Sequence, residues 1–99
     1  MILIVRPRAF RELAEIQDWY EERSPGLGLV WLREVERAVK RIMAAPDSCP
    51  MSRPPVRSLR LRRFPYHMFY WHEDDEIIVA AVLHIRRHPV QRPGESPAR

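Results

Sequence analysis

The sequence predicts a single α+β domain in the order β-α-α-β-β-β, with a helical hairpin packed on one face of a curved, mostly antiparallel four-stranded sheet. Two observations predict this class. Between residues 7 and 45, apolar residues recur at helical spacing. Between residues 56 and 83, short alternating or apolar runs are separated by turn residues, as in strands. The 99 residues are too few for two separate cores. We therefore expect one domain over residues 1–90 and a Pro-rich flexible tail over residues 91–99.

The amino-terminal half begins with a strand and a helix. Residues 2–5 form a β-branched apolar run, which is typical of a strand. Pro7 suits the first turn of a helix, because its missing N–H is not needed there. The breakers at residues 24–26 end this helix near residue 23. Its predicted apolar side consists of Ala9, Leu13, Ile16 and Tyr20. Its acids are expected to form a solvated face: Glu12, Glu15, Glu21 and Glu22.

A second helix is predicted over residues 27–45, and Pro46 and Asp47 close it. Its predicted apolar stripe consists of Leu32, Val35, Val39 and Ile42, extended by Leu29 and Val30. The opposite side is expected to carry Arg33, Glu34, Glu36, Arg37, Lys40 and Arg41. Two amphipathic helices joined by a tight turn make a hairpin with one apolar side to bury.

The carboxyl-terminal half predicts a loop and three strands. Residues 47–55 contain three prolines and are read as a loop. Residues 56–62 alternate, which directs Leu59 and Leu61 to one face and Ser58, Arg60 and Arg62 to the other. Residues 66–72 are aromatic-rich, and residues 77–83 are apolar on both parities, as in a central strand. The acidic residues 73–76 are a hairpin turn.

The sheet face away from the helices is expected to hold the function, because it collects arginines and alternate aromatic side chains. Arginine on an exposed strand can instead serve only to prevent edge-to-edge aggregation. The residues proposed for target or partner binding are Arg57, Arg60, Arg62, Arg63, Tyr70, Arg86 and Arg87. At least two of the aromatic residues between 66 and 71 are expected to face the helices, as core.

Composition excludes several classes of function. One cysteine, Cys49, allows neither an internal disulfide nor a cysteine-based metal cage. The four histidines have no metal-ligand spacing, so no metal and no cofactor are expected. No stretch approaches the roughly 20 apolar residues of a membrane-spanning helix, and we expect a cytoplasmic protein without membrane contact. The net charge of +4 is compatible with nucleic acid or with an acidic protein partner.

The carboxyl-terminal half resembles a known family in two motifs. The first is Val56-Arg57-x-Leu59-x-Leu61-x-x-Phe64-Pro65-Tyr66-x-x-x-Tyr70. The second is Val82-x-His84-x-Arg86-Arg87-x-Pro89. Together with the helix pattern before them, they resemble the RelE/ParE toxins of type II toxin–antitoxin systems over residues 2–89. The resemblance implies the same β-α-α-β-β-β order and a cognate antitoxin as partner, with operator DNA contacted only through the antitoxin complex.

The family contains two activities. RelE-like members are ribosome-dependent messenger RNA endoribonucleases, and ParE-like members are taken to inhibit DNA gyrase. If this chain were a ribonuclease, the resemblance would assign catalysis to Arg60, His67 and Arg87. However, Ser58 stands where a second basic residue is implied, and no tyrosine follows Tyr70. These departures favour the ParE-like branch, hence a protein inhibitor rather than an enzyme. The alternatives are the ribonuclease and an inactive family member that only binds antitoxin.

Overall fold

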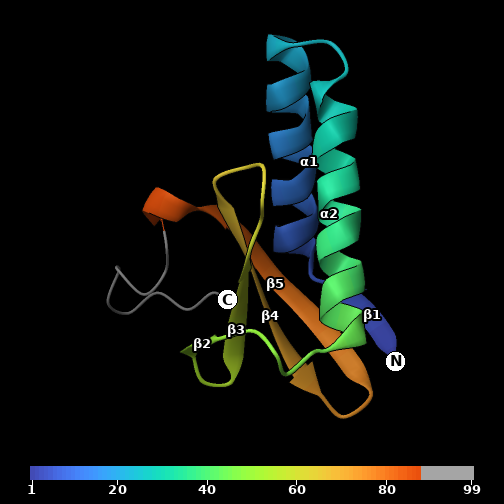
Figure 1. Cartoon of the computed structure of the whole chain (residues 1–99), viewed down its shortest axis with the longest axis vertical. Coiled ribbons are helices and arrows are strands. Elements are labelled where there is room, and N and C mark those ends of the chain that lie inside the picture. Colours follow the sequence, from blue (N-terminus) through green and yellow to red (C-terminus); the bar gives the residue numbers. More distant parts are fainter. Residues whose placement is uncertain (88–99) are drawn as a thin grey trace.

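The computed structural model describes residues 1–87, with Arg87 described by its backbone alone. The elements follow in the order β1 (Ile2–Val5), α1 (Pro7–Arg23), α2 (Leu27–Ala44), β2 (Met51–Arg53), β3 (Val56–Arg60), β4 (Tyr66–Glu73), β5 (Glu76–His84) and a short 3-10 helix (Ile85–Arg87) (Figure 1). The predicted α+β class is confirmed. The expected tail at 91–99 lies outside the described residues.

The sheet has five strands in the order β1-β5-β4-β3-β2, one more than predicted. β1 is parallel to β5, and the remaining pairs are antiparallel. The additional strand is β2, within the segment predicted to be a loop. Three residues among prolines are too short to show alternation. Their strand character comes from pairing with β3, where Met51 lies opposite Arg57.

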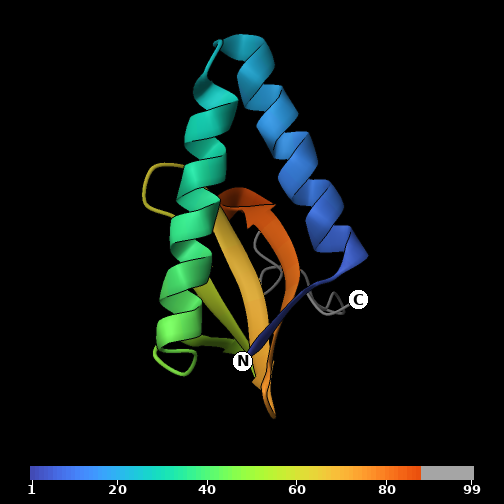
Figure 2. The ribbon, with the colours of Figure 1, turned by 90° about the vertical axis from the view of Figure 1, so that its right-hand side faces the viewer.

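Both helices lie on one face of the twisted sheet, and the tip of the hairpin extends beyond it (Figures 1 and 2). The predicted apolar side of α1 is confirmed, since Ala9 is fully buried and Leu13, Ile16 and Tyr20 pack against the core. The predicted stripe of α2 is wrong in part. Leu29 and Leu32 are exposed, and the buried apolar residues are Trp31, Val35, Ala38 and Ile42.

The buried face of α2 is thus rotated about the helix axis relative to the predicted one, and Trp31 gives the physical reason. Its ring is 1% exposed, and its Nε1–H donates to the carbonyl of Leu13 on α1 at 3.2 Å. The large ring gains more from burial than the neighbouring leucines do, because burial scales with apolar area. Phe64 closes the same cluster, edge-on to Trp31 with ring centres 5.2 Å apart.

A bulge in β5 changes which residues of this strand face the helices. Phe69 pairs with Ala81, whereas the next residue, Tyr70, pairs with Val79, which leaves Ala80 as the extra residue. Val79 and Val82 therefore both belong to the core beneath the helices. Ala81 belongs instead to a second cluster, on the other side of the sheet, with Val56 and Phe69.

Candidate functional site

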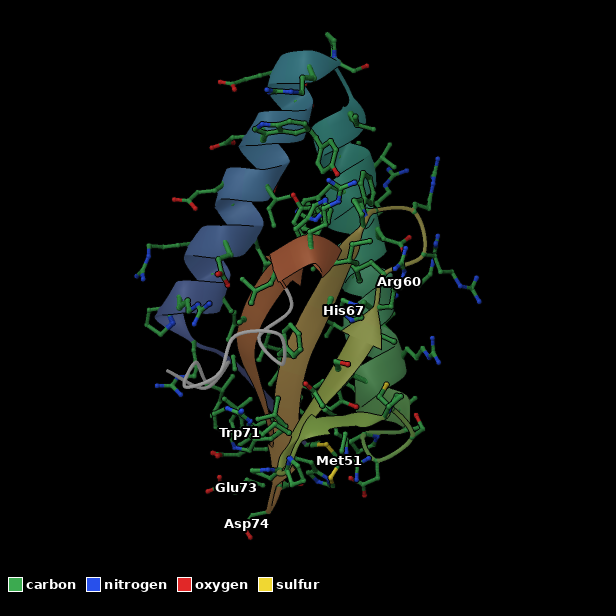
Figure 3. All side chains as sticks on the ribbon, turned by 90° about the vertical axis from the view of Figure 1, so that its left-hand side faces the viewer. Met51, Arg60, His67, Trp71, Glu73 and Asp74 are labelled. Atoms are coloured by element: carbon green, nitrogen blue, oxygen red, sulfur yellow. The ribbon has the colours of Figure 1, made fainter. Side chains whose placement is uncertain are left out.

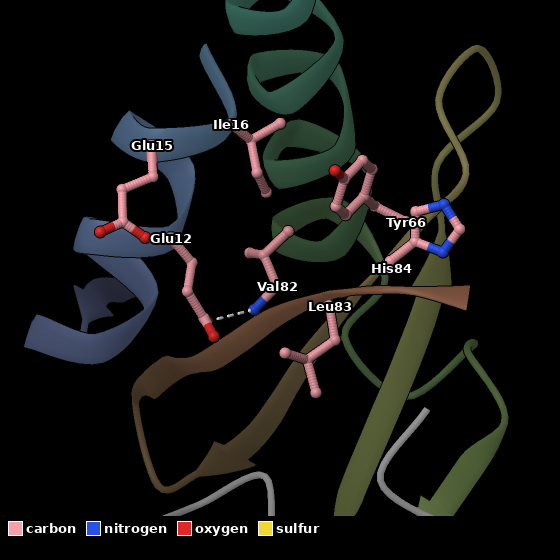
Figure 4. Close-up of a pocket in the computed structure, with 7 residues that line it drawn as sticks. All are labelled: Glu12, Glu15, Ile16, Tyr66, Val82, Leu83 and His84. Carbon is pink, nitrogen blue, oxygen red and sulfur yellow. Dashed lines mark hydrogen bonds between the residues drawn. The ribbon is translucent and has the colours of Figure 1, made fainter. Parts of the chain in front are cut away.

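One edge of the sheet is formed by the second half of β5, which β1 does not cover. The pairing with β1 ends at Val79. Beyond it, the backbone N–H of Val82 donates to Oε1 of Glu12 on α1 at 2.8 Å (Figure 4). Glu12 was predicted to be on a solvated face, and this was wrong: its carboxylate is only 20% exposed and also pairs with Arg8. Glu12 thus accepts a hydrogen bond from a strand-edge N–H that would otherwise face outward without a partner strand.

A pocket of about 170 Å³ lies beside this edge (Figure 4). It is lined by Glu12, Glu15, Ile16, Tyr66, Val82, Leu83 and His84. Tyr66 and His84 are directly opposite each other on β4 and β5, and their rings meet edge to face at 5.3 Å. The two motifs that carry the family resemblance are therefore neighbours in space, at the same end of the sheet.

On the opposite side of the sheet, the end of β3 is likewise left uncovered by its neighbouring strand, and a carboxylate from α2 accepts a hydrogen bond there. β2 covers only the start of β3, at Val56 and Arg57. Just past the end of β3, the N–H of Arg62 donates to Oε2 of Glu34 at 3.0 Å. Glu34 was predicted to lie on the polar side of α2, and this was wrong, because it is 4% exposed. Its other oxygen accepts from Arg37 at 2.9 Å.

The predicted arginines divide into two groups. Arg60, Arg62, Arg63 and Arg86 are exposed, as a binding surface requires. Arg57 is not available in this way: its Nη1–H donates to the carbonyl of Cys49 at 2.7 Å, and its side chain is 18% exposed. It shares the core-facing parity of Leu59, so its role is to hold the preceding loop against the sheet. The side chain of Arg87 lies outside the described part of the chain.

Tyr70 was proposed as a partner contact, and the structure places its side chain in the core. The side chain is completely buried, and its hydroxyl donates to the carbonyl of Pro46 at 2.7 Å. Burial, followed by a hydrogen bond with Cys49, raises the pKa of the Tyr70 phenol. Tyr70 therefore anchors the end of α2 to the sheet and presents nothing to a partner.

The sheet face away from the helices carries fewer accessible aromatics than expected. Phe69 is completely buried, and His67 stacks on it with ring centres 5.9 Å apart. Arg60 and His67 are cross-strand neighbours on β3 and β4 (Figure 3). Trp71 is half-buried further along β4, with the guanidinium of Arg6 5.8 Å from its ring centre. The face thus offers a cation and an imidazole side by side rather than a row of stacking rings.

Sequence reasoning missed the two carboxylate caps and the approach of α2 arginines to β3. A shallow groove of about 30 Å³ is lined by Glu34, Arg37, Ala38, Arg41, Leu59, Arg60, Leu61 and Arg62. No sequence signal places Arg37 and Arg41 beside Arg60, because that contact depends on how α2 is seated. Among residues 1–87, no group of three or more potential ligands could hold a metal ion, and no described helix is long and apolar enough to cross a membrane.

A helical hairpin on one face of an open mixed sheet, with family motifs joined at the ends of β4 and β5, defines the class of protein as a RelE/ParE-type α+β domain. The family model described as "ParE toxin of type II toxin-antitoxin system, parDE" matches residues 3–89. The chain therefore belongs to the ParE toxin family and is the toxin component of a type II toxin–antitoxin system, with a cognate antitoxin as partner.

One solved structure supports the fold independently. It is described as the chromosomal ParDE TA system from P. aeruginosa and is similar to this chain with a TM-score of 0.75 and 24% sequence identity. The match covers 85% of this chain and 95% of that chain. No curated protein matches the chain.

Proposed function

We propose that this toxin arrests growth by inhibiting DNA gyrase or a related type II topoisomerase, and that its antitoxin prevents this. Membership of the ParE toxin family over residues 3–89 carries the proposal. The incomplete ribonuclease set supports it, because cleavage through the 2′-OH needs a base, charge stabilisation and an acid for the leaving oxygen. Ser58 and the lack of a tyrosine after Tyr70 leave that set short.

The test is a supercoiling assay with purified toxin, purified gyrase, ATP and relaxed plasmid. Inhibition that rises with toxin concentration and is relieved by the antitoxin is expected. Uninhibited supercoiling, together with cleavage of ribosome-bound message by the same preparation, would reject the proposal.

A ribonuclease remains the second candidate because of one observation: Arg60 and His67 lie directly opposite each other on β3 and β4. Histidine can transfer protons near neutral pH, and an adjacent guanidinium can steady a phosphorane. Codon-positioned cleavage that is lost in Arg87→Ala or His67→Ala, and retained in the control Arg11→Ala, would establish this activity instead.

The helical hairpin offers a surface for the antitoxin. An apolar cavity of about 230 Å³ is lined by Phe10, Leu13, Ala14, Gln17, Trp31, Leu32 and Val35. Phe10 is 66% and Leu32 38% exposed at its rim. Exposed apolar residues around a concavity mark protein-binding sites, and an apolar groove between helices suits the apolar face of an amphipathic segment. We infer that the antitoxin covers this apolar cavity of the helical hairpin.

A further inference from the structure

The flank formed by α2 and the end of β3 concentrates five exposed arginines, four of which have no ion pair among the described residues. We define this α2–β3 arginine flank as Arg33, Arg37, Arg41, Arg60 and Arg62. Of these, only Arg37 forms an ion pair, with Glu34. The other four have no ion pair among residues 1–87. By contrast, Arg8 on α1 pairs with Glu12, and Arg23 stacks on Trp19 at 3.5 Å.

The geometry of the flank is that of a row rather than a single charge. Arg33, Arg37 and Arg41 follow each other at four-residue steps along α2, which places them about 6 Å apart along the helix axis. Arg60 and Arg62, at the edge of the sheet, line the same shallow groove as Arg37 and Arg41. Glu34 is the only acid among the described residues that line this groove, and its oxygens already accept hydrogen bonds from Arg37 and the N–H of Arg62. The groove therefore keeps a strong positive excess.

Guanidinium chemistry and the shape of the groove together indicate the ligand. Each guanidinium can bind a phosphate with two parallel hydrogen bonds, and a row of cations matches a chain of phosphates. The described lining of the groove contains four arginines and one carboxylate, and both oxygens of that carboxylate already accept hydrogen bonds. A surface contact with a polyanion fits this groove better than a peptide does.

We propose that the α2–β3 arginine flank binds the phosphate backbone of nucleic acid without reading its sequence. This goes beyond topoisomerase inhibition and does not depend on it. In a complex with a topoisomerase, such a flank would add contacts to the DNA on which the enzyme acts.

The proposal is tested by fluorescence anisotropy of a short labelled duplex DNA and a single-stranded RNA of equal length, titrated with purified toxin at several salt concentrations. The test variant is Arg41→Gln with Arg60→Gln, because both side chains are exposed and lack an ion pair among the described residues. The matched control is Arg11→Gln with Arg23→Gln, which removes the same charge from α1.

We expect the test variant to weaken binding and to lower the salt slope by about two, roughly one per phosphate contact. The control should stay within about twofold of the wild type, since charge at a distance is screened. Tighter binding of either probe identifies duplex or single strand as the preferred source of phosphate. Equal losses in both variants would overturn the proposal. So would failure of both probes to bind while polyglutamate binds the flank, because the partner would then be an acidic protein.

Discussion

Oε1 of Glu12 on α1 accepts the backbone N–H of Val82 on β5 at 2.8 Å, although the two residues are 70 positions apart in the chain. Glu34 on α2 does the same for the N–H of Arg62 beyond β3. Each helix of the hairpin thus supplies one carboxylate to one edge of the sheet. Unpaired edge donors invite pairing with other strands, and each carboxylate satisfies one such N–H where the neighbouring strand ends.

Replacing Glu12 by alanine should destabilise the fold by about 1–3 kcal/mol, because the N–H of Val82 loses its acceptor. Glu12→Gln should cost less, since its amide oxygen can still accept. Glu15→Ala is the control on the same helix, with an exposed side chain and an expected change within about 0.5 kcal/mol. Urea unfolding measures all three. Equal stabilities of the Glu12→Ala and Glu15→Ala variants would show that the contact contributes nothing.

Glu34→Leu should accelerate amide hydrogen exchange at Arg62 on the order of tenfold, because local opening no longer breaks a hydrogen bond. Glu34→Gln should preserve most of the protection. Exchange followed by NMR, with Glu36→Gln as the exposed control, makes the comparison. Unchanged protection of Arg62 in Glu34→Leu would contradict the assigned cap.

Stability should fall in alkali because of Tyr70. Burial raises the pKa of its phenol above the ordinary 10.0, so the folded protein retains a proton that the unfolded chain releases above that pH. The stabilisation is complete below pH 10.0 and is lost as the pH rises further. Tyr70→Phe should cost about 0.5–1.5 kcal/mol at neutral pH, through the lost bond to Pro46, and should flatten the alkaline decline. Unfolding free energies on both sides of pH 10.0 decide this, and an equally steep decline in the variant would refute it.

The apolar cavity on the helical hairpin should determine how tightly the antitoxin binds and should not affect toxicity. A charge at its rim, Phe10→Glu or Leu32→Glu, should weaken antitoxin affinity by at least tenfold, because an apolar contact would have to bury an unpaired carboxylate. Arg11→Glu, beside Phe10 but outside the groove lining, is the control. Calorimetric titration with the antitoxin gives the affinities. Wild-type affinity in both groove variants would place the antitoxin elsewhere.

Local sequence patterns were sufficient for both helices and their ends and for four of the five strands, but not for β2. The helix predicted to end near residue 23 ends at Arg23, and the helix predicted from residue 27 begins at Leu27. Prolines and glycine act on their own neighbourhood, so their effect is visible in the chain. The family motifs were equally informative because Phe64 and Tyr66 fill the core beside Trp31.

Features set by distant contacts could not be predicted in this way. The rotation of α2 depends on Trp31 reaching Leu13, and the bulge at Ala80 depends on pairing with β4. Glu12 and Glu34 are drawn inward because each accepts an N–H that the neighbouring strand leaves unpaired. The sequence of a helix carries no sign of where strand pairing ends elsewhere in the chain. The half-buried position of Arg57 could not be predicted for the same reason, since its partner Cys49 lies in a loop whose path is set by the fold.

The most direct test of the central claim is induced expression of the toxin in bacteria that lack its antitoxin, with plasmid supercoiling and messenger RNA cleavage measured in the same cells. Topoisomerase inhibition predicts growth arrest with relaxed plasmid and intact message. Growth arrest with normally supercoiled plasmid and cleaved message would contradict the account and assign the toxin to the ribonucleases.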